Sequence, residues 1–174
     1  MSMESSLYQP VRGTLDVRSP AAGESSEVVL NLEPAATLRS PVTTGGLEFD
    51  ILDLDGAVVA HGGDGRIFSI IYPVHRPDGT IVLELGKTWR YTRVRVLRPG
   101  QAELRLRLGH RQPWSWLTDE CGTVVASMLE SGTALGAPDG FQLRLSEPAL
   151  SVVQAVAMAE FAAMRIGALR AQAI

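Results

Sequence analysis

The stretch from Pro148 to Ile166, PALSVVQAVAMAEFAAMRI, decides the fold. It predicts a helix over residues 147–168, with N-cap chemistry from Ser146 and Glu147 and a proline in the first turn, where a missing N–H costs little. Ala149 to Ala159 carries no charge, so this part of the helix is apolar on every side. Such a helix is enclosed by the rest of the chain rather than laid on its surface.

A membrane span is the alternative interpretation of this stretch. A span needs about 20 mainly apolar residues, but Gln154, Glu160 and Arg165 interrupt the run, and alanine dominates over leucine and isoleucine. One charged residue near the centre of a bilayer costs roughly 2.5–3.5 kcal/mol. We therefore favour a buried helix, whose small side chains let surrounding strands approach closely.

The chain before this helix consists of short alternating runs separated by glycine turns. The turn glycines are Gly56, Gly79, Gly100, Gly122 and Gly140. Glycine turns between alternating runs predict a series of β-hairpins, each too small to bury its own apolar face. The predicted strands are Leu47–Leu54, Ala57–His61, Arg66–Tyr72, Thr80–Leu85, Arg90–Leu97, Gln101–Leu108, Trp114–Thr118, Thr123–Leu129 and Phe141–Leu145.

The N-terminal region is less regular. Residues 1–26 are polar and lack a sustained period, which predicts a flexible arm containing one strand near Thr14–Arg18. Glu27–Leu32 predicts the next strand, and Pro34 and Pro41 interrupt the segment after it.

Together these elements predict a mainly β fold, a closed antiparallel β-barrel of about 10–12 strands wrapped around a buried C-terminal α-helix. Sheets of that size close or split to hide their edges. The length of 174 residues and the apolar content of 45% suit one such domain, over residues 27–174. The lone Cys121 excludes an intramolecular disulfide, and the N-terminus lacks the apolar segment of a signal peptide, so we expect a cytoplasmic protein.

Positive charge is concentrated in one predicted hairpin. The net charge is −3, yet Lys87–Arg111 carries eight basic residues and one acid, Glu103. Alternation places four arginines on one face of two adjacent strands, where guanidinium groups can clamp phosphates. The alternative is an ordinary solvated outer face that neighbouring acids neutralise. The candidate anion- or lipid-binding residues are Arg90, Arg93, Arg95, Arg105 and Arg107, with Arg98 and Arg111 nearby.

Hairpins that end in one enclosed helix resemble the tubby C-terminal-like superfamily, and more narrowly its LURP-one-related and phospholipid scramblase-like branch. The resemblance covers Leu47 to Ile166 and implies a twelve-stranded antiparallel barrel around a C-terminal helix. The stretches that carry it are ILDLDGAVVA (51–60), RPDGTIVLELGKTWRYTRVRVLRPGQAELRLRL (76–108), WSWLTDECGTVVASMLE (114–130) and GFQLRLSEPALSVVQAVAMAEFAAM (140–164).

The resemblance implies a binding module rather than an enzyme. Tubby-like members bind phosphoinositides through basic side chains, and scramblase-like members associate with membranes, often through acylated cysteines and Ca²⁺. This sequence has no cysteine cluster and no obvious Ca²⁺ loop, which argues against lipid scrambling. The expected partner is an anionic membrane surface, with peripheral attachment, or another protein. Self-association stays open, and no nucleic acid partner is expected.

A phosphatase motif is the main competing interpretation. ILDLDGAVV resembles the nucleophile motif of haloacid-dehalogenase-type phosphatases, with Asp53 as nucleophile and Asp55 as acid/base. That chemistry needs βαβ units, but no helix of adequate length follows and Lys87 is the only lysine. We therefore interpret Asp55-Gly56 as a type I′ turn.

Other reactive or aromatic side chains predict no further site. Trp114 and Trp116 share one strand face, and we expect them to cap a barrel end or fill a seam, with an aromatic binding patch as the alternative. We predict no catalytic residue, no metal site and no cofactor. The residues considered for zinc, whose spacing matches no zinc pattern, are His61, His75, His110 and Cys121.

Overall fold

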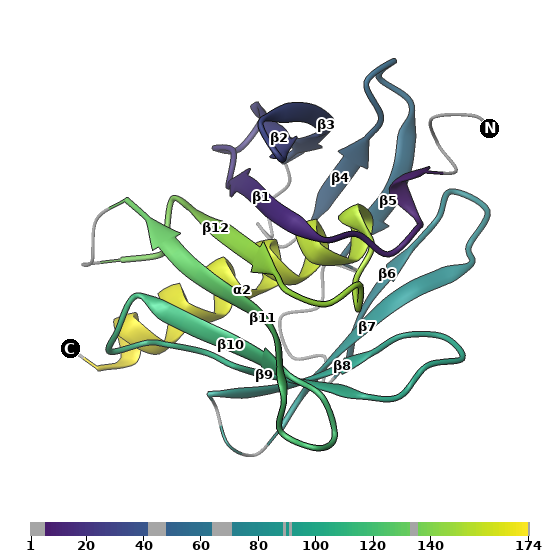
Figure 1. The fold of residues 1–174 in the computed structure, drawn as a ribbon. Coiled ribbons are helices and arrows are strands. Elements are labelled where there is room, and N and C mark those ends of the chain that lie inside the picture. The colour runs from purple at the N-terminus through teal and green to yellow at the C-terminus, as the bar shows by residue number, and fades with distance from the viewer. Residues whose placement is uncertain are drawn as a thin grey trace.

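The chain forms a closed antiparallel β-barrel around one helix, as the sequence predicts (Figure 1). The structure is a computed structural model, and it describes residues 6–41, 48–63, 71–88, 90, 92–132 and 136–173. The strands are β1 (Gly13–Arg18), β2 (Ser25–Leu30), β3 (Glu33–Arg39), β4 (Phe49–Leu52), β5 (Val58–Gly62), β6 (Ile71–His75), β7 (Ile81–Lys87), β8 (Arg93–Leu97), β9 (Leu104–Arg107), β10 (Trp114–Thr118), β11 (Val124–Ser131) and β12 (Gly140–Leu145). Each pairs with its neighbours in the sequence, and β12 closes the barrel against β1.

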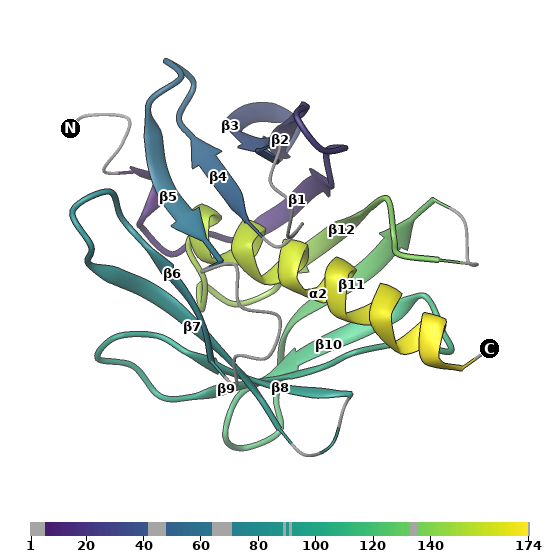
Figure 2. The same ribbon diagram turned by 180° about the vertical axis from the view of Figure 1, so that it is seen from behind.

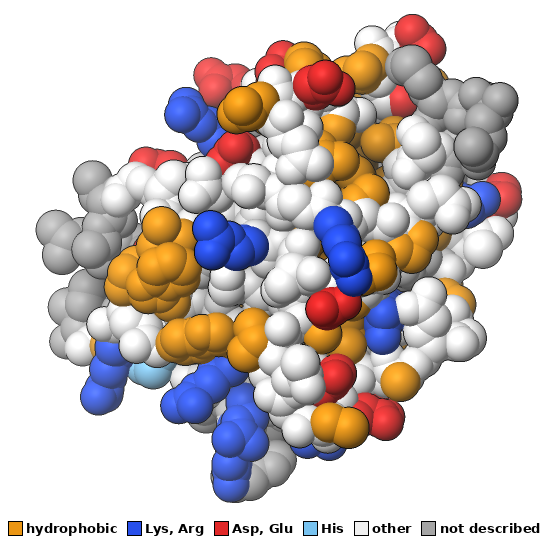
Figure 3. All heavy atoms as spheres, in the orientation of Figure 1, with side chains coloured by type: hydrophobic (Ala, Val, Ile, Leu, Met, Phe, Trp, Pro, Cys, Tyr) orange, Lys and Arg blue, Asp and Glu red, His pale blue; other side chains and the backbone are white. Residues whose placement is uncertain are grey.

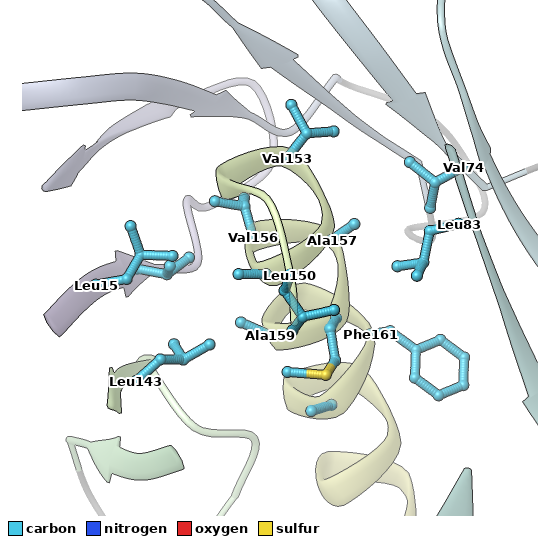
Figure 4. Close-up of a cluster of buried hydrophobic side chains, with 14 of the residues drawn as sticks. Leu15, Val74, Leu83, Leu143, Leu150, Val153, Val156, Ala157, Ala159 and Phe161 are labelled. Carbon is cyan, nitrogen blue, oxygen red and sulfur yellow. The ribbon is translucent and has the colours of Figure 1, made fainter. Parts of the chain in front are cut away.

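Helix α2 (Val152–Gln172) fills the barrel, as the views from the two sides show (Figures 1 and 2). Eleven of its residues are buried, and they face every side of the helix. In the close-up, Leu15 and Leu143 lie on one side of the helix, and Val74 and Leu83 lie on the other (Figure 4). The apolar run therefore packs against strands all round, which confirms the predicted enclosure.

The helix begins and ends later than the predicted 147–168. Its N-cap is Ser151, rather than Ser146 or Glu147, because a capping box forms there. The Ser151 hydroxyl accepts a hydrogen bond from the backbone N–H of Gln154 at 3.2 Å, and the Gln154 side-chain oxygen accepts one from the backbone N–H of Ser151 at 3.0 Å. The S-x-x-Q spacing that closes this box is the stronger start signal.

Two arginines hold the segments at the ends of the helix. Arg98 is buried and donates to the backbone oxygen of Ala149 at 2.6 Å, just before the helix begins. In the last turn, Arg170 donates to both carboxylate oxygens of Glu130 on β11, at 3.0 and 2.5 Å. Bidentate pairs of this kind fix orientation as well as adding energy.

By length and composition, α2 is also apolar enough to span a membrane. However, 61% of the relevant window is buried inside the protein. Gln154, which interrupts the apolar run, donates from Nε2 to the backbone oxygen of Val82 at 2.9 Å. The polar group is thus satisfied inside the barrel, as a core helix requires.

The predicted N-terminal arm needs a correction. Its expected strand near Thr14–Arg18 is present as β1, but β1 belongs to the barrel. It pairs with β12 along six residue pairs, from Gly13↔Leu145 to Arg18↔Gly140. β2 also begins inside the stretch assigned to the arm, at Ser25. The polar, small residues of this region concealed the place of these strands in the barrel, which depends on long-range pairing.

Strand β3 is absent from the sequence prediction, which stopped at the proline. Asn31 and Leu32 have positive φ values of 52° and 71°, and they form the two-residue turn between β2 and β3. Pro34 is opposite Val29, next to a shift in register that begins at Val28. Proline is tolerated in a strand at such a bulge. The strand predicted as Glu27–Leu32 therefore ends earlier, and a hairpin replaces the expected interruption.

Two predicted strands extend beyond the part of the chain that the structure describes. Leu47 of the predicted Leu47–Leu54 lies outside the described residues, as do residues 66–70 of the predicted Arg66–Tyr72. The described remainders fall in β4 and in the start of β6.

Phe161 offers a test of the enclosed helix. Its side chain is 1% exposed, and its ring lies 5.4 Å from that of Tyr72 on β6. We expect Phe161→Ala to lower the free energy of unfolding by about 3–5 kcal/mol, because the cavity cannot collapse fully. Urea denaturation followed by fluorescence measures this loss. Leu169→Ala, at a half-buried position in the same helix, is the control, and an equal effect of the two variants would contradict the enclosed packing.

Glu160 is the one acidic side chain of α2, and it is largely enclosed. Burial raises its pKa above the ordinary value of 4.5, and a hydrogen bond with Ser19 only partly offsets this. Its Oε2 atom has no hydrogen-bond partner among the described residues. Because the folded state disfavours the charged form, stability is fully present below the ordinary pKa and is lost as pH rises through the folded-state pKa.

We therefore expect Glu160→Gln to be more stable than the natural chain at neutral pH and to lose that advantage on acidification below about pH 4.5. Urea denaturation across a pH series measures the difference. Glu24→Gln, at an exposed position, controls for the loss of one charge. A stability gain that grows as the pH falls would show that the carboxylate is favoured in the folded state.

Candidate anion-binding face

Four of the five predicted arginines lie together on the outer face of β8 and β9. Residues directly opposite each other on these strands are Arg93↔Arg107 and Arg95↔Arg105. All four are exposed, and the residues that alternate with them, such as Val94 and Leu106, are buried in the core. The period-two pattern therefore places the arginines as the sequence predicted.

One acid neutralises part of this face. Glu103 Oε2 accepts from Nε and Nη2 of Arg95 at 2.9 and 2.7 Å, and Oε1 lies 4.0 Å from Nε of Arg105. The hydrogen bond from Arg95, together with the charges of Arg95 and Arg105, holds the pKa of Glu103 below its ordinary value. Arg93 and Arg107 form no ion pair with any carboxylate that the structure describes. Like charges directly across a strand pair destabilise each other, so an anion at this point is favoured.

A hollow of about 460 Å³ lies over this unneutralised pair. Its floor and walls combine guanidinium groups with an indole and a hydroxyl. Figure 3 shows basic side chains gathered along the lower part of this face, beside hydrophobic side chains. The lining residues are Arg93, Arg105, Leu106, Arg107, Trp116, Thr118 and Val124.

The remaining predicted arginines take different positions. Arg90 is exposed but precedes β8, and it lines a neighbouring hollow of about 360 Å³ with Arg93 and Arg95. The strand predicted from Arg90 in fact begins at Arg93. Arg98 does not contribute to the face, because it is buried and donates hydrogen bonds near the start of the helix.

A larger hollow, of about 800 Å³, lies over β1, β2, β11 and β12. Asp16 and Glu27 are among its lining residues, and Asp16 already accepts a hydrogen bond from Gln142 at 3.3 Å. Its lining carries three carboxylates and one guanidinium, that of Arg18, so its charge does not favour an anion and size alone does not make it an anion site.

The tryptophans lie outside the barrel, contrary to the expectation that they fill a seam or cap an end. Trp114 is 44% exposed, and Trp116 is half-buried directly opposite Arg107. The alternative interpretation, an aromatic patch, fits this position. The sequence indicates that Trp116 faces outward, because it alternates with the buried Leu117. It does not indicate that Trp116 lies opposite Arg107, because this depends on the register between β9 and β10.

The phosphatase-like motif forms a turn. Asp53 is 8% exposed, and its Oδ1 accepts from the backbone N–H groups of Asp55 and Ala57 at 3.0 and 2.8 Å. Gly56 has a φ of 87°, whereas Asp55 is not among the residues with positive φ. A type I′ turn requires positive φ at both central positions, so that prediction is wrong. The hairpin instead uses a three-residue loop that ends in a left-handed glycine, closed by a hydrogen bond from Asp53 N–H to the Ala57 oxygen at 2.9 Å.

Substitution of Asp53 tests the role of its carboxylate in the turn. We expect Asp53→Ala to lower the free energy of unfolding by about 1–2 kcal/mol, because two backbone donors lose their acceptor. Asp55→Ala, whose side chain is exposed, should change stability by less than about 0.5 kcal/mol. Thermal or urea denaturation of both variants measures this. Equal stability of the two variants would show that the Asp53 carboxylate does not hold the loop.

No group of three or more His, Cys, Asp or Glu side chains in the described part of the chain is arranged to hold a metal ion. Cys121 is exposed in the turn between β10 and β11, where its backbone N–H donates to Asp119.

Comparison with known proteins supports the fold and gives no information on function. No family model and no curated protein matches the sequence. An X-ray structure of a protein from Arabidopsis thaliana is similar to this chain, with 14% identity and a TM-score of 0.58 over 94% of this chain and 95% of that one. At so low an identity, the likeness shows the shared fold alone.

Proposed function

We propose that this protein is a non-enzymatic binding module of the tubby-like kind, close to LURP-one-related and scramblase-like proteins. It engages anionic lipid headgroups at the cytoplasmic surface of a membrane, through the exposed arginines on the outer face of β8 and β9, here called the basic face. These arginines are Arg93, Arg95, Arg105 and Arg107. The observation that carries the proposal is the directly opposed, exposed pair Arg93↔Arg107, which no described carboxylate neutralises.

The surroundings of the pair favour a phosphate-bearing surface. Guanidinium groups bind phosphate oxygens in a bidentate manner, and each basic residue near an anionic membrane contributes about 1 kcal/mol. Trp114 and Trp116 follow on the adjacent strand, and tryptophan is favoured at the boundary between headgroups and acyl chains. All four arginines are exposed on the outside of the barrel, where a membrane surface can reach them.

The closed interior argues against a buried ligand site. Core positions on the strands contact α2 or one another, so the space inside the barrel is occupied by side chains. This packing of the described residues favours binding on the outside, where alternation along each strand places the polar groups.

Vesicle co-sedimentation tests this function. We expect binding to phosphatidylcholine vesicles only when anionic lipid is included, and weaker binding at higher salt because screening shortens the reach of the charges. Arg93→Gln with Arg107→Gln should weaken binding about 10- to 30-fold, from the loss of two cations near the surface. Arg12→Gln with Arg18→Gln removes the same charge from other exposed positions and should leave most binding intact.

The outcomes distinguish the candidate partners. Unchanged binding of the Arg93/Arg107 double variant, or equal binding to uncharged vesicles, would overturn the headgroup proposal. If no vesicle binds, the basic face serves a protein partner or is only a solvated surface. Pull-downs with and without the double substitution then decide between those two.

A further inference from the structure

A second row of polar side chains crosses the outer surface of the barrel on β4, β5 and β6, away from the arginines of β8 and β9. Asp50 on β4 pairs with His61 on β5, and His61 pairs with His75 on β6. The neighbouring residues on these strands, such as Ile51 and Val74, are buried, so the row faces outward. The rings of His61 and His75 have centroids 5.5 Å apart and are tilted by 53°.

Both histidines have the same ring nitrogen engaged. Nδ1 of His61 lies 2.7 Å from Oδ1 of Asp50, and Nδ1 of His75 lies 3.1 Å from the backbone oxygen of Arg76. Because a carboxylate and a carbonyl only accept hydrogen bonds, each Nδ1 carries the proton when the ring is neutral. The lone pair of each imidazole is therefore on Nε2, the nitrogen best placed to bind a metal.

The carboxylate that orients His61 is itself held in place. Both oxygens of the Asp50 carboxylate make polar contacts. Oδ2 accepts from Arg39 at 2.6 Å, while Oδ1 faces His61. Asp50 thus has both oxygens occupied, and it acts on the imidazole rather than as a ligand.

The separation of the rings suits one shared ion. Imidazole nitrogens bind Zn²⁺ at about 2.0–2.1 Å, which places each ring centroid roughly 3 Å from the ion. Two rings on a tetrahedral ion therefore have centroids roughly 5 Å apart, close to the 5.5 Å between His61 and His75. The His61 side chain is 31% exposed, so an ion can reach it from solvent.

We propose that His61 and His75 form a surface site for a divalent transition-metal ion, with Asp50 as the residue that positions His61. Imidazole favours Zn²⁺, Ni²⁺ and Cu²⁺ over Mg²⁺ and Ca²⁺. The two histidines supply two ligands, and water completes the coordination. The site is independent of the basic face and of its proposed function.

The location gives the metal a structural consequence. Among the described residues, the ladder between β5 and β6 consists of two residue pairs, His61↔His75 and Gly62↔Val74. A metal ion that bridges the histidines crosslinks the barrel at this short seam. Because such an ion binds the folded chain and not the unfolded chain, it raises the stability of the fold by mass action.

Isothermal titration calorimetry of the full chain, without a histidine tag, tests the site. Ni²⁺ and Zn²⁺ are the probes, and Mg²⁺ is the control ion. We expect one ion per chain, at least a tenfold loss of affinity in His61→Ala and in His75→Ala, and no such loss in His110→Ala. Asp50→Asn should weaken binding about tenfold, as does loss of other carboxylates that orient a metal-binding histidine.

Thermal unfolding gives a second readout that does not depend on the heat of binding. The metal should raise the unfolding midpoint of the natural chain and of His110→Ala, and leave the midpoints of His61→Ala and His75→Ala unchanged. Binding that survives loss of either histidine, or a midpoint that rises equally in all variants, would overturn the proposal. So would the absence of Ni²⁺ and Zn²⁺ binding to the natural chain.

Discussion

The enclosure of α2 is the constraint on which the rest of this structure depends. Eight strands close around a space that their own side chains just fill, whereas twelve leave a wider interior that needs another occupant. A helix fits only if it is apolar on every side and narrow enough for the strands. Helix α2 meets both conditions because it contains alanines, whose side chains are apolar and small. Three of them, Ala155, Ala157 and Ala159, are fully buried. Arg98 and Arg170 then attach the chain to the barrel near each end of the helix.

Because apolar packing uses the interior, most polar side chains of the described residues lie on the outside of the barrel. Each strand contributes alternate residues to the outer surface, and pairing brings residues that are distant in the sequence into rows. The basic face is one such row across β8 and β9, and Trp116 on β10 continues it. The row from Arg39 to His75 across β3 to β6 is another. Neither row requires a cleft, since both are built from the surface of the sheet itself.

The sequence predicts features that depend on local pattern, and it fails for features that depend on pairing between distant strands. Alternation placed Arg93, Arg95, Arg105 and Arg107 on one face, and the uncharged run placed α2 inside. In contrast, Pro34 concealed β3, because only the bulge beside it in the same strand makes a proline acceptable there. The pairings Trp116↔Arg107 and His61↔His75 depend on register, which no local property of either strand reveals. The type I′ turn predicted from Asp55-Gly56 was also wrong. The side chain of Asp53 accepts two backbone hydrogen bonds there and stabilises a three-residue loop instead.

The two outer rows differ in how fully their charges are compensated, and the two binding proposals rest on this difference. In the row from Arg39 to His75, Asp50 is shared between a guanidinium and an imidazole, so the remaining unused groups are nitrogen lone pairs. In the basic face, Glu103 serves Arg95 and approaches Arg105, which leaves Arg93 and Arg107 opposed to each other. Lone pairs attract a cation that accepts electrons, and opposed guanidinium groups attract an anion that separates them. The same sheet surface thus offers opposite chemistries, set by the position of single carboxylates.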